Sequence, residues 1–319
     1  MSTPTSTPTG TPTGTPTGTT AMTGATGGLG LHAARELLRR APGTHLVVLA
    51  RASSAARALP LLREVSPHVS AVPVDLASTA DVTAAADRVA GLLDAGDLPP
   101  LRGVVCNAGV HLDSALHATV DGHETTFAVN VLSTHLLLRR LSTRLRAPAR
   151  VVVTVSDAHF GDVRHAGGVF PRPRWTTPEA LARPGGHPRP GSVRAGRRAC
   201  ATSKLGGIHL VHEWARRLPA GIDVVAHNPG LVVGTGLARS AGGAAELVVG
   251  RVVPVLARTP LVRTPGVAGR ELADVVLGST PAPTGSYVHR TRVAPSSRES
   301  YDPAREAELW TWLEAAASR

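Results

Sequence analysis

The stretch that most constrains the fold runs from Thr23 to Gly30 and reads Thr-Gly-Ala-Thr-Gly-Gly-Leu-Gly. It follows a short apolar run, Thr19–Thr23, and leads into Leu29–Arg40, where apolar residues return every three or four positions. Glycines between a strand and a helix let the backbone approach a pyrophosphate, whose charge is met by free N–H groups and by the positive end of the helix dipole. The stretch therefore predicts a dinucleotide site, with a tight structural turn as the alternative.

Short apolar runs alternate with segments of helical period along the rest of the chain. The predicted strands are Thr19–Thr23, His45–Ala50, Val69–Val74, Gly103–Cys106, Val151–Val155 and Ile222–Ala226. The clearest predicted helices are Leu29–Arg40, Ala80–Leu93, His123–Leu145 and Cys200–Leu218. Strands separated by helices imply right-handed crossovers, so we expect an α/β fold: a doubly wound parallel sheet of the Rossmann type in a single domain.

The two ends of the chain differ in character. Residues 1–18 are rich in Thr, Pro and Gly and cannot bury apolar surface, so they are predicted to form a disordered tail ahead of a domain at 19–319. After the last predicted strand of the sheet we expect a helical run at 244–278, a strand near Ser286–His289 and a final helix near Pro303–Ala317. Trp310 and Trp312 are expected to pack within the protein.

Composition narrows the class of protein. The net charge is +11, but the arginines are scattered and lack interleaved aromatic residues, which argues against a nucleic-acid partner. Cys106 and Cys200 are the only cysteines and fit neither a disulfide framework nor a zinc site, so no metal is expected. The sequence shows no secretion signal and no membrane span. We therefore expect a cytoplasmic protein with a small-molecule substrate.

Two basic residues bear on the cofactor. Arg51 follows the second predicted strand, where an acidic residue would bind a ribose 2′-hydroxyl; an arginine can instead pair with a 2′-phosphate, which favours NADP(H) over NAD. Arg51 as an ordinary surface arginine is the alternative. Lys204 is the only lysine among 34 basic residues, which suggests a position that needs a compact, tunable charge.

Further polar positions follow the predicted strands in order: Asp75-Leu76, Asn107-Ala108-Gly109, Asn130, Ser156, Lys204 and Asn228-Pro229-Gly230. Together with Thr23–Gly30, which matches TGxxxGxG, and with the NAG motif at Asn107, this order resembles the short-chain dehydrogenase/reductase family from Thr23 to about Thr235. Asp121-Gly122-His123-Glu124, Ser156-Asp157-Ala158-His159 and Thr235-Gly236-Leu237 are similar to the retinol dehydrogenase and protochlorophyllide reductase group.

The resemblance implies a hydride moved between NADP(H) and a carbonyl or alkene carbon of a small organic substrate. It also implies that Ser156 hydrogen-bonds the substrate oxygen, Asn130 holds a water in a proton relay and Lys204 binds the nicotinamide ribose. A homodimer is possible, because the family often pairs subunits through its long helices. The cofactor-binding residues implied are Thr23, Gly24, Thr26, Gly28, Leu29, Gly30, Arg51, Asp75, Leu76, Asn107, Ala108, Gly109, Lys204, Pro229, Gly230, Val232 and Thr235.

The family's YxxxK motif stands here as Cys200-Ala201-Thr202-Ser203-Lys204, so the catalytic tyrosine is replaced by a cysteine. Three hypotheses follow. In the first, an oxidoreductase continues with a proton from water, from His159 or from the substrate, since general acid help is worth about 10²–10⁴-fold. In the second, Cys200 is reactive, because a predicted helix N-terminus and Lys204 four residues on both lower a thiol pKa. In the third, the fold serves a non-redox enzyme, such as a cyclase, dehydratase or isomerase, or a regulatory nucleotide-binding protein.

An inserted segment separates Ser156 from Cys200. Residues at about 162–198 are rich in Gly, Pro and Arg, and they include His165, Phe170, Trp175 and His187. A long segment entering next to catalytic positions can form a substrate lid or wall, and its arginines could favour an anionic or carrier-bound substrate. The alternative is a solvated, partly disordered loop.

Overall fold

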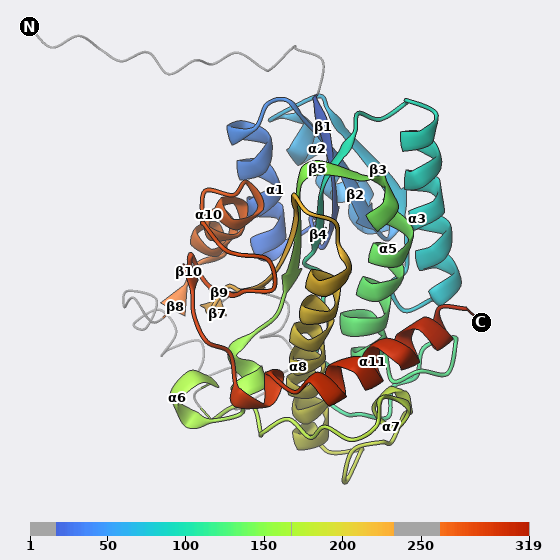
Figure 1. The fold of residues 1–319 in the computed structure, drawn as a ribbon, viewed down its shortest axis with the longest axis vertical. Helices are drawn as coiled ribbons and strands as arrows, with labels where there is room; N and C mark the ends of the chain where they lie inside the picture. Colours follow the sequence, from blue (N-terminus) through green and yellow to red (C-terminus); the bar gives the residue numbers. More distant parts are fainter. Residues whose placement is uncertain (1–16, 167, 233–261, 319) are drawn as a thin grey trace, which may run out of the picture.

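The computed structural model describes residues 17–166, 168–232 and 262–318 (Figure 1). The predicted tail therefore lies almost entirely outside the described residues, and so does the first part of the helical run predicted at 244–278. The first strand begins at Gly18.

An eight-stranded sheet forms the centre of the molecule, in the order β10-β9-β6-β5-β4-β1-β2-β3. All its neighbouring strands run parallel except β10, which is antiparallel to β9. The strands are β1 Gly18–Thr23, β2 Thr44–Ala50, β3 Val69–Pro73, β4 Leu101–Cys106, β5 Leu145–Thr154, β6 Ile222–Asn228, β9 Tyr287–His289 and β10 Arg292–Val293; β7 Leu231–Val232 and β8 Val262–Arg263 pair separately. The order β3-β2-β1-β4-β5-β6 is that of a Rossmann fold, with its topological switch point between β1 and β4.

Helices cover both faces of the sheet (Figure 1). On one face lie α1 Gly28–Arg40, α2 Ala52–Arg63 and α10 Pro265–Val276; on the other lie α3 Thr79–Asp94, α5 Ser133–Leu141 and α8 Val193–Arg217. Successive strand residues supply the two cores in alternation: Val104 packs with α3 and α5, whereas Val105 packs with α1 and α10. This period of two is what a sheet buried on both sides requires.

A C-terminal helix, α11 Pro303–Ala316, crosses α5 and α8 from outside (Figure 1). Trp310 meets Trp214 of α8 with ring centroids 5.1 Å apart, and Trp312 meets Phe127 at 5.8 Å. The expectation that both tryptophans pack within the protein is confirmed.

Two predicted helix boundaries were wrong. Helix α8 begins at Val193 rather than Cys200, with Ser192 as its N-cap; the arginine-rich turn before Cys200 hides the helical period. The segment predicted as one helix at His123–Leu145 contains α4 Thr125–Phe127, a π-helical turn η1 Ala128–Leu132 and then α5, and Leu145 already belongs to β5. Helix α2, which carries Pro60 in its interior, was not among the clearest predicted helices.

The inserted segment holds more regular structure than a solvated loop. It contains α6 Val163–Ala166 and α7 Pro178–Ala182, together with the first turn of α8. Leu181, Ala182 and His187 are buried, and Trp175 packs edge-on against His209 of α8. Among the helices the structure describes, none is both long enough and apolar enough to cross a membrane.

Candidate cofactor site and active site

The glycine turn after β1 is shaped by close backbone contacts. Gly24 has φ +69°, and Gly28 has φ +53°, both in the left-handed region that favours glycine. A Cβ on Gly30 would lie 1.9 Å from the carbonyl oxygen of Gly24, so no larger residue fits there. The turn therefore brings the start of α1 directly against the end of β1.

The start of α1 can receive an anion. Gly27 is its N-cap and offers no side-chain cap, and the first turn holds no acidic residue. A Cβ on Gly27 would meet nothing within 4 Å, so the space beside this N-cap residue is open. A pyrophosphate fits this chemistry, because the free N–H groups and the helix dipole both favour negative charge.

The NAG motif is tied to the ends of three strands. Thr23 Oγ1 accepts from the N–H groups of Asn107 and Ala108, each at 3.1 Å. Asn107 donates through Nδ2 to Gly24 O at 3.2 Å and accepts from Thr154 Oγ1 at 3.2 Å. The carboxyl ends of β1, β4 and β5 are thereby joined at the switch point, where this class of fold binds its ligands.

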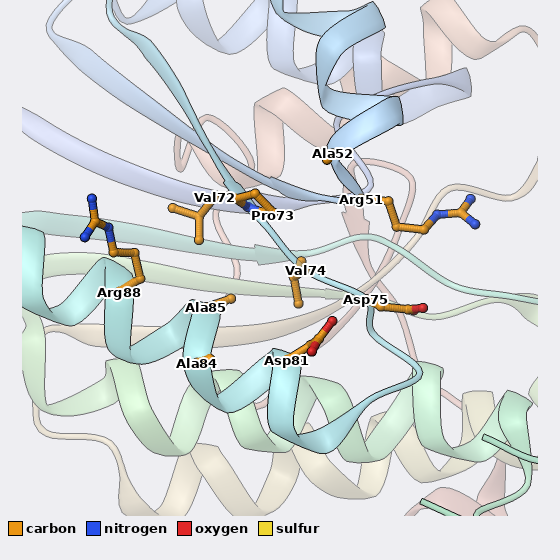
Figure 2. Close-up of a pocket in the computed structure, with 10 residues that line it drawn as sticks. All are labelled: Arg51, Ala52, Val72, Pro73, Val74, Asp75, Asp81, Ala84, Ala85 and Arg88. Carbon is orange, nitrogen blue, oxygen red and sulfur yellow. The ribbon is translucent and has the colours of Figure 1, made fainter. Parts of the chain in front are cut away.

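Arg51 lies at one side of an open pocket of about 440 Å³ beyond β2 and β3 (Figure 2). Its guanidinium is exposed and has no ion pair or hydrogen bond among the described residues. Asp75 extends from the end of β3 toward the same side as Arg51 (Figure 2), and its Oδ1 accepts from the Ala77 N–H at 3.0 Å. The pocket is lined by Arg51, Ala52, Val72, Pro73, Val74, Asp75, Asp81, Ala84, Ala85 and Arg88.

Lys204 reaches from α8 to the end of β5. Its Nζ donates to the carbonyl oxygen of Thr154 at 3.1 Å, and it would lie 3.3 Å from a Cβ placed on Gly109. Burial lowers the pKa of the Lys204 ammonium, and the neighbouring Cys200 opposes this shift. Lys204 therefore stands beside the NAG turn, and its ribose-binding role stays a prediction.

Asn130 uses its side chain to hold the loop after the NAG motif. Its Oδ1 accepts from Val110 N at 2.9 Å, while Nδ2 donates to Val110 O at 3.1 Å and to Ser203 Oγ at 2.8 Å. The carbonyl oxygen of Asn130 accepts from Thr134 Oγ1 at 3.4 Å, within a backbone widened by η1. Its observed contacts are structural; a water relay through Asn130 stays a prediction.

Ser156 follows β5 and remains half-buried. Its Oγ accepts from the Ala158 N–H at 3.2 Å and so caps the short 3₁₀ helix η3 Asp157–Phe160. The hydroxyl proton is not used in that bond. Ser156 can therefore still donate to a substrate oxygen.

His159 is not placed to act as a replacement acid. The side chain is buried, with Nδ1 2.7 Å from Ser156 O and Nε2 accepting from Ser297 N at 3.1 Å. These partners require the proton on Nδ1 and occupy both ring nitrogens. Burial also lowers the pKa of His159 to about 4, so the ring is neutral at neutral pH and fixes two loops together.

The premise for a reactive Cys200 is wrong. Because α8 begins at Val193, Cys200 lies within the helix and not at its N-terminus. The thiol is 1% exposed, and burial raises its pKa to about 11, with Lys204 lowering it and Glu124 raising it further. A buried, protonated thiol is a poor nucleophile and a poor metal ligand.

The loop after β6 is fixed by a polar cluster. Asn228 Nδ2 lies 2.6 Å from Asp157 Oδ1, 2.7 Å from Tyr287 OH and 2.8 Å from His289 Nδ1. Asn228 Oδ1 accepts from Gly230 N at 3.0 Å, and Gly230 has φ +73°. Pro229 and Gly230 are thus held at the ends of β5 and β6, and Val232 follows in β7; Thr235 lies outside the described residues.

Sequence reasoning assigned no role to Tyr287, Asp157 or His111. Tyr287, far along the chain, donates to Asp157 Oδ1 at 3.1 Å, next to Ser156. No local sequence pattern indicates this pairing, because Tyr287 and Asp157 are 130 positions apart and come together only when β9 pairs with β6. His111 could have been suspected, since it comes two residues after Gly109.

Comparisons with known proteins agree with this architecture. A model of the KR domain family matches residues 18–160. "Short chain dehydrogenase atnD" of Emericella nidulans is 31% identical over 262 residues, covering 74% of each chain; "Retinol dehydrogenase 12" of Mus musculus is 31% identical over 219 residues, covering 66% of this chain and 60% of its own. The crystal structure of a blue fluorescent protein from a metagenomic library in complex with NADPH superposes with a TM-score of 0.61 at 22% identity, covering 86% of this chain and 96% of that one.

The fold and these likenesses define the class: a Rossmann-type oxidoreductase. The chain belongs to the short-chain dehydrogenase/reductase family. The likeness to retinol dehydrogenases that the sequence motifs predicted is confirmed.

Proposed function

We propose that this protein is an NADP(H)-dependent reductase that acts on a carbonyl or an activated alkene of a small organic substrate with an atypical proton donor. The observation that carries the proposal is the convergence of Lys204, Gly109 and Ser156 at the carboxyl end of β5, next to an anion-receptive helix start at Gly27. When bound, NADPH would supply the hydride.

Different residues would bind different parts of NADPH. The N–H groups at the start of α1 would hold the pyrophosphate, and Lys204 would hold a ribose hydroxyl through the N–H bonds that Thr154 leaves free. Arg51, unpaired among the described residues, would meet the 2′-phosphate. Thr26, Leu29, Leu76, Ala108 and Val232 would complete the cofactor-binding surface.

The substrate would meet Ser156 and the inserted segment. Ser156 would donate its free hydroxyl proton to the substrate oxygen, while Cys200, buried and protonated, would only fill space. The inserted segment would form one wall of the substrate pocket, because Trp175 anchors it on α8.

Calorimetric titration with NADPH tests the first half of this function. We expect saturable binding with a dissociation constant below the millimolar range and weaker binding of NADH. Absence of binding at millimolar NADPH would refute the proposal. Oxidation of NADPH by a panel of aldehydes, ketones and quinones tests the second half.

A second candidate is a non-redox enzyme on the same fold, such as a cyclase, dehydratase or isomerase. The buried thiol at position 200 favours it, since burial and a raised pKa make that thiol a poor proton donor. It predicts tight NADPH binding and product formation without any change in absorbance at the nicotinamide band. A regulatory nucleotide-binding protein predicts binding with no product at all.

A further inference from the structure

The loop that follows the NAG motif lies against α8 at two points. At the first, Asn130 binds both backbone groups of Val110 and also donates to Ser203 Oγ at 2.8 Å. At the second, a Cβ on Gly196 would lie 2.2 Å from Leu112 O and 2.7 Å from Ser114 N. Only glycine permits this second approach.

His111 sits between these two points. Asn130 links Val110, which precedes His111, to Ser203 of α8, and Leu112, which follows His111, lies against Gly196 of α8. The loop therefore runs antiparallel to α8 here. The stretch of α8 between Gly196 and Ser203 contains Cys200. The two points at which the loop is held against α8 thus stand on either side of Cys200, and His111 is the loop residue between them.

The ring of His111 has an unused polar atom. Nε2 is buried and has no hydrogen-bond partner among the residues the structure describes. Phe170 of the inserted segment covers the ring, with centroids 5.4 Å apart, and Arg197 of α8 donates to Val169 O at 3.5 Å from the same region. A buried nitrogen without a partner requires an explanation, and a role in binding a substrate atom is one.

The charges around His111 favour a neutral ring. Burial lowers the pKa of the imidazole, Arg197 lowers it further, and Asp113 opposes both. Arg197 comes from α8 and Asp113 from the loop itself. A neutral imidazole with its proton on Nε2 is a hydrogen-bond donor throughout the neutral range.

We propose that His111, with Arg197 beside it, binds the substrate oxygen that a tyrosine at position 200 would otherwise hold. The inference rests on the proposed reductase function. In that reaction the carbonyl carbon gains the hydride of NADPH, which is oxidised to NADP⁺. The π electron pair moves to the oxygen, where His111 Nε2–H and Arg197 stabilise the negative charge, and the oxygen then takes a proton from water, which leaves as hydroxide.

The kinetic test compares His111→Phe, His111→Gln and the control His45→Gln with NADPH and 4-nitrobenzaldehyde, an aromatic aldehyde. His45 lies at the amino end of β2, bonded to Ser70, away from the site. We expect His111→Phe to lower kcat about 100-fold, as loss of an oxyanion donor does. His111→Gln keeps an N–H donor and should recover part of that loss, while the dissociation constant of NADPH stays unchanged in all three variants.

A second readout does not depend on turnover. The protein carries ¹⁵N-labelled histidine, and 4-nitrobenzaldehyde is added in the presence of NADP⁺, which has no hydride to give to the carbonyl. The Nε2 resonance of His111, assigned by its absence in His111→Phe, should shift on addition of the aldehyde. A resonance that stays unshifted with NADP⁺ bound, or a kcat of His111→Phe within threefold of the wild type, overturns the inference. Failure of NADPH to bind would overturn the proposed function and not the role of His111. If the wild-type protein binds NADPH but does not turn over 4-nitrobenzaldehyde, the presence or absence of the resonance shift decides whether His111 binds the substrate oxygen.

Discussion

Lys204 Nζ donates to the carbonyl oxygen of Thr154 at 3.1 Å, which joins the middle of α8 to the last residue of β5. This single bond leaves two ammonium protons of Lys204 for a ligand, beside the glycine of the NAG turn. The backbone thus holds the only lysine of the chain at the carboxyl end of β5, a central strand of the sheet.

Replacing Lys204 with Met should weaken NADPH binding by about 10–100-fold, because a hydrogen bond to a charged group contributes about 1.5–3 kcal/mol. The melting temperature should not fall in proportion to the loss of affinity, since the substitution also removes a buried charge. Lys204→Arg should not restore the affinity, because a guanidinium is planar and larger than the ammonium. Calorimetry with each variant measures the affinities. Equal affinities for the wild type and Lys204→Met would contradict the ribose-binding role.

Arg51→Asp should reverse the cofactor preference. The exposed guanidinium would pair with a 2′-phosphate, whereas a carboxylate there repels it, so binding of NADPH should weaken at least tenfold more than binding of NADH, or about 1.4 kcal/mol. Arg57→Ala, on the exposed side of α2, is the matched control. Competition between the two nucleotides, followed by fluorescence, gives both constants. Equal losses for the two nucleotides would remove the case for NADP(H).

The two cysteines should be unreactive in the native protein. Burial raises the pKa of Cys200 to about 11 and that of Cys106 to about 12. A thiol reagent at pH 7.5 should therefore label two groups in denaturant and none in the folded protein.

The same shifts predict loss of stability at alkaline pH. Because the folded pKa of Cys200 is higher than the unfolded value of about 8.5, the unfolded chain loses its proton first, so stability falls as the pH rises from about 9 toward 11. Cys200→Ala should make this fall shallower in denaturant titrations. An unchanged slope would show that the thiol is already ionised or exposed.

Five buried histidines should weaken the fold in mild acid. Burial lowers the pKa of His135, His159, His187, His209 and His227 to about 4 each. The unfolded chain takes up protons near pH 6.5, so stability is full above that value and falls between about 6.5 and 4. Urea midpoints measured across this range should drop steeply, and His159→Gln should reduce the slope. A flat profile would contradict the burial of these rings.

The C-terminal helix predicts the state of association. Glu306 of α11 accepts from His212 Nδ1 and Arg216 Nη2, each at 2.6 Å, and Glu314 lies 3.1 Å from Arg139 Nε of α5. Since α11 occupies the outer side of α5 and α8, we predict that the chain does not pair through these two helices. Light scattering at micromolar concentration measures the state of association, and a dimer that Glu314→Lys weakens would contradict the prediction.

The sequence predicted where the main strands lie along the chain, and also the glycine turn, because both follow from local period and from glycine chemistry. The errors had two causes: a helical turn without an apolar face, and contacts between residues far apart in the sequence. The start of α8 was hidden by Arg194, Arg197 and Arg198, which can extend a helix without an apolar stripe. The partners of His159 and Asp157 come from residues more than 100 positions away, Ser297 and Tyr287, which no pattern near either residue reveals.

Gly196, against which the loop at Leu112 rests, acts as a spacer between that loop and α8. A methyl group added there would clash with Leu112 O and Ser114 N, so the loop that carries His111 and α8 must move apart. Selection of variants for bulkier substrates should therefore enrich Ala and Ser at position 196 before it alters the pocket walls, which would make this buried glycine the control point for substrate size.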